Sequence, residues 1–276
     1  MKNIVSITVL LLKVIYKRIR RYKYSISKLF LSNNNVYKGF CNICGKDTWF
    51  FLRENSTYNN SMECINCGGI ARYRLISLLL VNNILKNKSI DKSLSLLDLG
   101  KLEIGILDTS YMSPLYKYLK NKGIVYMSEY LPGLEKKIPF LNLYHQDLMK
   151  ISFSRESIDI IITSEVFEHI TEPLKAFEEI YRILKPGGIH IFTIPYNENS
   201  ATRSRILIED GMIQYKLPKL YHKNPLSLKG SLVCTDFGYD LIDNLKLLNF
   251  QTELITLTDN KLGFYNTSVF ISKKIA

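Results

Sequence analysis

The chain of 276 residues lacks a hydrophobic run long enough to cross a bilayer. Residues 4–15 are apolar apart from Ser6, Thr8 and Lys13, but this run is shorter than the roughly 20 residues that a spanning helix needs. No small-residue cleavage site follows it, which argues against a processed signal peptide. With 46% hydrophobic residues and a mean hydropathy of -0.01, the chain is globular, and its length suffices for one core and a small appendage.

Acidic residues are absent before Asp47. The chain has 37 basic and 25 acidic residues, a net charge of +12, and eight of the basic residues precede residue 32. The remainder therefore carries only +4 (12 minus 8), which is weak evidence for nucleic-acid binding. Residues 1–31 are predicted to form a basic amphipathic helix that contacts the anionic inner face of a membrane. The alternatives are a helix packed on the domain and a flexible tail.

Cysteine is scarce, and four of the five cysteines lie in two close pairs. Cys41 and Cys44 form the first pair, Cys64 and Cys67 the second, and a glycine follows each pair. Such pairs suit metal binding in a reducing, cytoplasmic compartment better than a disulfide framework. Four thiolates can hold zinc tetrahedrally and leave no open position for chemistry, so residues 36–72 are predicted to form a structural zinc ribbon.

The stretch over 157–196 predicts a strand, a helix and a second strand. Residues 158–162 are almost entirely β-branched, as in a strand buried on both faces of a parallel sheet. Pro173 can open a helix that Gly187 and Gly188 end, and a strand over 189–194 follows. In such crossover units ligands bind beyond the carboxyl ends of the strands, where this chain carries Ser164, Glu165, Glu168 and His169.

The ordered segments SIDIIITSEVFEHI, AFEEIYRILKPGG and IHIFTIPY resemble the central signature of class I S-adenosylmethionine-dependent methyltransferases. The resemblance implies a Rossmann-like α/β fold over 73–276, with a seven-stranded sheet closed by an antiparallel hairpin over 251–258 and 264–272. The paired cysteines match only a subgroup with an N-terminal zinc ribbon, which the segments YHKNP (221–225) and DFGYD (236–240) also resemble. That subgroup is associated with sugar and cell-surface polysaccharide pathways.

Two segments compete for the first strand and its loop. One ends at Asp98 and Gly100, and the other runs over 102–108 into a loop with Ser110 and Ser113. An acidic residue for the ribose hydroxyls is expected about 20 residues past that loop, and Glu129 lies 21 positions after Asp108 but 31 after Asp98. The second segment is therefore preferred, with a short helix over 114–122.

By this resemblance, the cofactor S-adenosylmethionine binds at the ends of three strands. The acids Asp108, Glu129 and Asp147 each follow a predicted strand. Ser110 and Ser113 stand where the family usually has glycines. Serine can be tolerated at these positions if the backbone angles there are ordinary. The expected cofactor-binding residues are Asp108, Ser110, Ser113, Glu129, Asp147, Leu148, Ser164 and Glu165.

The acceptor site is expected in a long irregular insertion over 197–237. His169, with Glu168 to orient it, and His222 are the candidate catalytic residues. The leading hypothesis is methyl transfer to a hydroxyl or amine of a small molecule or glycan. RNA methylation is a second hypothesis, against which the ribbon lacks a basic surface. A non-catalytic zinc-ribbon protein with a degenerate methyltransferase fold is the third, motivated by Ser110 and Ser113.

Overall fold

The computed structural model describes residues 36–52, 61–110, 113–131, 143–224 and 227–275. The predicted amphipathic helix over 1–31, and with it the predicted membrane contact, lies outside the described residues. Within them, no helix combines the length and the apolar character that a membrane crossing requires.

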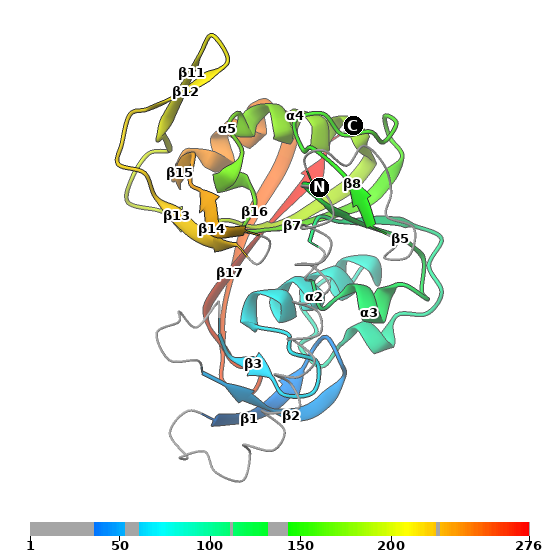
Figure 1. Ribbon diagram of the computed structural model, residues 1–276. Coiled ribbons are helices and arrows are strands. Elements are labelled where there is room, and N and C mark those ends of the chain that lie inside the picture. Colours follow the sequence, from blue (N-terminus) through cyan, green and yellow to red (C-terminus); the bar gives the residue numbers. More distant parts are fainter. Residues whose placement is uncertain (1–35, 53–60, 111–112, 132–142, 225–226, 276) are drawn as a thin grey trace, which may run out of the picture.

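A seven-stranded sheet forms the centre of the protein (Figure 1). Five strands run parallel, and β17 pairs antiparallel with both β8 and β16. The order across the sheet is β16-β17-β8-β7-β4-β5-β6, which confirms the methyltransferase-type sheet with a terminal hairpin. The strands span Gly105–Asp108 (β4), Ile124–Glu129 (β5), Leu143–His145 (β6), Ile158–Ser164 (β7), Leu184–Thr193 (β8), Phe250–Asp259 (β16) and Phe264–Lys274 (β17).

Side chains alternate between the two faces of this sheet, as the period of a strand requires. Ile160 and Ile162 belong to one core cluster with helix α2 (Ala71–Ile84), whereas Ile161 belongs to the other. The second cluster packs against α4 (Pro173–Ile183) and α5 (Leu241–Leu247). Figure 1 shows α2 on one face and α4 and α5 on the other, so helices pack on both faces of the sheet.

The predicted choice of the first strand is correct. β4 ends at Asp108, while the rejected segment forms a turn of 3-10 helix, η2 (Leu96–Asp98), that Ser95 caps. The predicted helix over 114–122 is shorter than expected, because α3 spans only Tyr116–Leu119. Pro114 precedes this helix instead of opening it.

The cysteine-rich segment forms a small antiparallel sheet of β1 (Val36–Cys41), β2 (Lys46–Phe51) and β3 (Glu63–Cys64). It shares a core cluster with α2 and the main sheet. The fully buried guanidinium of Arg74 joins the two parts: it donates to the carbonyls of Met62 and Gly69 on one side and of Leu262 and Gly263 on the other. The segment is therefore anchored to the β16–β17 turn.

The insertion over 197–237 is not irregular, contrary to expectation. Its strands form two hairpins and a small three-stranded sheet. The first hairpin turns at Asp210 and Gly211, both with positive φ (50° and 74°), a two-residue turn that matches strand twist. This Asp-Gly pair was the signal that the sequence reasoning overlooked. The strands are Tyr196–Asn197 (β9), Arg203–Ser204 (β10), Ile206–Glu209 (β11), Met212–Tyr215 (β12), Tyr221–Asn224 (β13), Ser227–Leu232 (β14) and Thr235–Gly238 (β15).

Candidate functional site

The predicted cofactor residues lie at the carboxyl edge of the sheet. Asp108 ends β4, Glu129 ends β5, and Ser164 ends β7. The chain order reverses between β4 and β7, which are paired with Asp108 opposite Ile162. In open α/β sheets a ligand crevice forms outside the carboxyl ends at this reversal. The fold therefore gathers these side chains from three strands at one ligand-binding edge.

Asp108 is buried, with 1% of its surface exposed. Its Oδ1 atom accepts a hydrogen bond of 3.2 Å from the backbone N–H of Ser110, and Oδ2 has no partner among the described residues. Burial raises the pKa of Asp108 to about 7. A carboxyl group held in this way has one oxygen available to a ligand's donor or cationic group.

The serines of the first loop adopt ordinary backbone angles, since neither Ser110 nor Ser113 has a positive φ. Ser113 accepts a hydrogen bond from the N–H of Leu115 at 3.2 Å. The Ser110 hydroxyl accepts a hydrogen bond of 3.3 Å from the hydroxyl of Tyr73, a residue of α2. Glycine is therefore not required by backbone conformation at either position. Tyr73 was not among the residues expected at this edge, and only the packing of α2 brings it there.

The next two acids stand at the ends of β5 and β6. Glu129 accepts a hydrogen bond from the N–H of Tyr130 at 3.2 Å. Asp147 closes a turn by accepting from the N–H of Met149 at 2.9 Å. Leu148, which lies between Asp147 and Met149 in this turn, is buried in the core cluster that packs against α4. Its side chain therefore packs in the core rather than at the edge.

The corner after β7 is a strained turn. Glu165 has φ of 55°, a left-handed conformation that is uncommon for a residue with a side chain. Its N–H donates to the carbonyl of Thr193, and Ser164 and Thr193 pair through their hydroxyls at 3.0 Å. Arg72 of α2 lies 3.8 Å from the Glu165 carboxylate, whose pKa burial raises. Strain of this kind is often concentrated at functional sites.

The three candidate catalytic residues come together. Glu168 and His169 belong to the 3-10 turn η4 (Phe167–His169), and His222 comes from β13. Oε1 of Glu168 lies 3.5 Å from Nε2 of His169 and 3.6 Å from Nδ1 of His222. The Glu168 carboxylate raises the pKa of His222, although this separation is longer than a hydrogen bond.

A cavity of about 430 Å³ lies against this cluster. Glu168 and His222 line it together with Tyr196, Arg203 and Asp236. Arg203 and Asp236 form an ion pair of 2.9 Å across β10 and β15. The cavity thus combines apolar walls with hydrogen-bonding groups and is large enough for a small molecule. The pairing of Arg203 with Asp236 required the β-structure that the sequence reasoning did not expect in this insertion.

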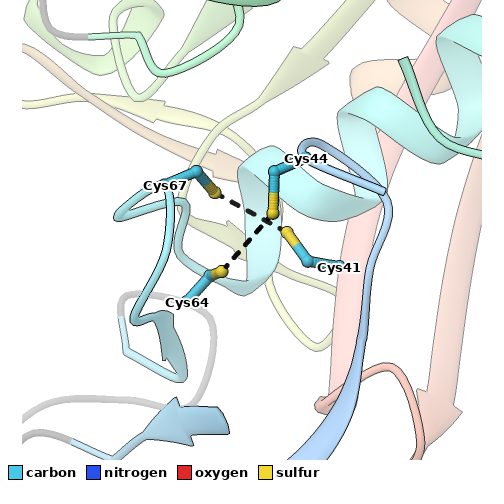
Figure 2. A group of neighbouring side chains, drawn as sticks. All are labelled: Cys41, Cys44, Cys64 and Cys67. Carbon is cyan, nitrogen blue, oxygen red and sulfur yellow. Dashed lines mark hydrogen bonds between the residues drawn. The ribbon is translucent and has the colours of Figure 1, made fainter. Parts of the chain in front are cut away.

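The four paired cysteines converge (Figure 2). All are buried, and their Sγ atoms lie within 4.8 Å of one another, with Cys41 to Cys67 at 3.6 Å and Cys44 to Cys64 at 3.9 Å. These distances exceed the roughly 2.05 Å of a disulfide bond. Gly45 and Gly68 have φ of 62° and 73°, so the glycine after each pair makes a left-handed turn that favours glycine.

The two histidines outside the cluster of candidate catalytic residues, His145 and His190, make contacts within the fold. His190 is fully buried, contacts the hydroxyl of Thr163 at 2.9 Å and has a pKa lowered by burial to about 3. His145 accepts a hydrogen bond from the N–H of Leu131 at 2.9 Å. The remaining cysteine, Cys234, is buried, and its Sγ lies 3.6 Å from the carbonyl of His169.

Part of the chain is similar to known methyltransferases. Residues 102–192 match the family model described as a methyltransferase domain. The chain is 28% identical over 124 residues to the sterol 24-C-methyltransferase of Pneumocystis carinii, covering 42% of this chain and 30% of that protein. It is 37% identical over 65 residues to cycloartenol-C-24-methyltransferase 1 of Oryza sativa, covering 22% and 19%. The chain thus spans less than a third of the length of these curated relatives.

Among solved structures, the fold is similar to a chain of the complex between the Haloferax volcanii Trm112 methyltransferase activator and a methyltransferase. The TM-score is 0.44 with 15% identity, and the match covers 66% of this chain and 86% of that one. The family match falls on the central sheet, because residues 102–192 hold β4, β5, β6, β7 and α4.

Proposed function

We propose that the protein is an S-adenosylmethionine-dependent methyltransferase acting on a hydroxyl or amine of a small molecule or glycan. The observation that supports it most is the gathering of Asp108 and Glu129 at the carboxyl edge, beside a corner that leads to the acceptor cavity. The cavity's volume of about 430 Å³ suits a small ligand or one or two sugar rings.

Each residue has a role in this proposal. Glu129 accepts hydrogen bonds from the ribose hydroxyls, and Asp147 from the adenine amino group, while Asp108, Ser110 and Ser113 contact the amino-acid part. When bound, the cofactor supplies a methyl group on a positively charged sulfur. The chain then has mainly to position the acceptor and exclude water. Glu168 and His222, which line the cavity, hold the acceptor group, with His169 beside Glu168.

We further propose that the cysteine cluster holds a structural zinc ion. Zinc bound tetrahedrally at about 2.3 Å separates its sulfur ligands by about 3.8 Å. The 3.6 and 3.9 Å distances match this separation, and all four thiols are buried. Four sulfur ligands leave no coordination position for a substrate. The ion would therefore hold the two cysteine pairs together and take no part in methyl transfer.

Calorimetric titration of the folded, zinc-loaded protein with S-adenosylmethionine tests the function. Glu129→Ala should weaken binding about 30- to 1000-fold, because it removes hydrogen bonds to a charged group worth about 2–4 kcal/mol together. Glu253→Ala is the matched control, since Glu253 is exposed on β16 at the opposite side of the sheet. An unchanged constant for Glu129→Ala would contradict this cofactor site. Folded protein that binds no cofactor would favour the non-catalytic hypothesis.

A further inference from the structure

The cluster of Glu168, His169 and His222 has the composition of a metal site. Its three ligand atoms lie within 4.8 Å of one another and come from two segments far apart in the chain, η4 and β13. The two imidazole rings stand almost perpendicular, with centroids 5.3 Å apart and an interplanar angle of 86°. Both rings therefore direct a nitrogen at the same carboxylate oxygen without stacking.

Glu168 is the unusual member of the cluster. Only 1% of its surface is exposed, and neither carboxylate oxygen has a hydrogen-bond partner among the described residues. An ionised carboxylate buried without a partner costs several kcal/mol, so such a group is normally hydrogen-bonded or bound to a cation. The distances of 3.5 and 3.6 Å to the two histidines are too long for the charge-assisted bonds of about 2.8 Å expected for an imidazolium.

The hydrogen bond of His169 fixes which of its ring nitrogens faces Glu168. Its Nδ1 atom is 2.7 Å from the carbonyl oxygen of Leu232, so Nδ1 carries the proton and donates it to that carbonyl. In the neutral ring, Nε2 then presents a lone pair toward the Glu168 carboxylate 3.5 Å away. Two lone pairs facing each other repel unless a cation separates them. A backbone carbonyl that orients the ring through its second nitrogen is also common in metal-binding histidines.

The spacing fits a bound ion. Two ligands each about 2.1 Å from a metal, at a tetrahedral angle, lie about 3.4 Å apart. The observed 3.5 and 3.6 Å need only a small contraction to reach this value. Two imidazoles and one carboxylate suit zinc, manganese or iron in the divalent state and leave coordination positions open. Glu168 and His222 line the cavity of about 430 Å³, so those open positions face the proposed acceptor site.

We propose that Glu168, His169 and His222 bind a divalent transition-metal cation that coordinates the acceptor hydroxyl. The inference rests on the proposed function for its catalytic part, but the metal site itself does not. Coordination lowers the pKa of a hydroxyl, so its proton leaves for water more readily. In the transfer, the oxygen forms its bond to the methyl carbon, the carbon–sulfur bond breaks, and the electron pair of that bond stays on the sulfur. The acceptor is accordingly a hydroxyl compound rather than an amine.

Titration with Mn²⁺, followed by the electron paramagnetic resonance signal of the free ion, tests the site in the full-length protein with its cysteine cluster loaded with zinc. Mn²⁺ is the probe because thiolates bind it poorly, so the cysteine cluster does not compete. A parallel calorimetric titration uses Zn²⁺. One ion should bind per chain, and Glu168→Gln and His222→Asn should each weaken binding at least about 10-fold.

His145→Asn is the matched control, because His145 lies at the end of β6 and, among the described residues, belongs to no such cluster. The affinity of this variant for Mn²⁺ should equal that of the wild type. Retained cysteine-bound zinc and an unchanged melting curve show that each variant is folded. Absence of binding for both ions, or equal affinity in folded Glu168→Gln, overturns the metal site. If Mn²⁺ binds as expected but S-adenosylmethionine does not bind, the proposed function fails and the metal site stands. If methyl transfer proceeds without any bound ion, the metal's catalytic role fails and the function stands.

Discussion

Asp108→Asn should stabilise the protein without cofactor. The wild-type carboxyl is buried and has a pKa of about 7, against about 3.9 in the unfolded chain. Between these values the folded state binds more protons than the unfolded state, so the wild type loses stability as pH rises from 4 to 7. Asparagine has the same shape and no charge. The variant should therefore gain, relative to the wild type, about 3 kcal/mol between pH 5 and pH 8.

Urea unfolding of both proteins at pH 5, 6, 7 and 8 measures this difference. The same variant should bind S-adenosylmethionine more weakly, because it lacks an anionic oxygen of the proposed cofactor site. Stability gained at the expense of binding is typical of a group kept in an unfavourable environment for function. A difference in unfolding free energy that does not change with pH would refute the buried, half-paired carboxyl described above, whatever the effect on binding.

Three further predictions concern buried groups that stabilise the fold: Arg74, the cysteine cluster and His190. Arg74→Leu leaves backbone carbonyls of the cysteine-rich segment and of the β16–β17 turn without their donor. This variant should lower the free energy of unfolding, measured with denaturant, by about 3–5 kcal/mol. The control, Arg155→Leu at an exposed position, should change it by less than about 0.5 kcal/mol. Cys64→Ser should remove the cysteine-bound zinc, so that total zinc, measured by elemental analysis, falls by one ion per chain. The melting temperature should fall as well, because the cluster is part of the core. Unchanged zinc content would contradict the four-thiolate site. The pKa of His190 is about 3, below its unfolded value of about 6.5, so the unfolded state binds the extra proton and stability falls as pH decreases through this window. Between pH 6.5 and 5 the wild type should lose about 2 kcal/mol through this group, and His190→Phe should not; equal slopes for the two proteins would refute this.

Much of the fold follows from local patterns. The β-branched run that became β7, the proline-opened α4 and the terminal hairpin were each predicted close to their observed bounds. The spacing from Asp108 to Glu129 also selected the correct first strand, because parallel strands joined by short crossovers end at one edge. The insertion was mistaken for a loop because its strands are two to six residues long and carry little periodicity.

The sequence by itself determined which residue types were available: four paired cysteines, acids after strands, and a glutamate next to a histidine at a strand end. The strands, helices and turns that carry these residues depend on neighbours within a few positions, because the hydrophobic period and the turn residues determine the local backbone conformation. Only the tertiary structure decided that His222 meets Glu168 across 54 positions, that the glutamate has no hydrogen-bond partner among the described residues, and that Tyr73 reaches the first loop. Such contacts depend on how helices and hairpins pack on the sheet, which no local pattern specifies.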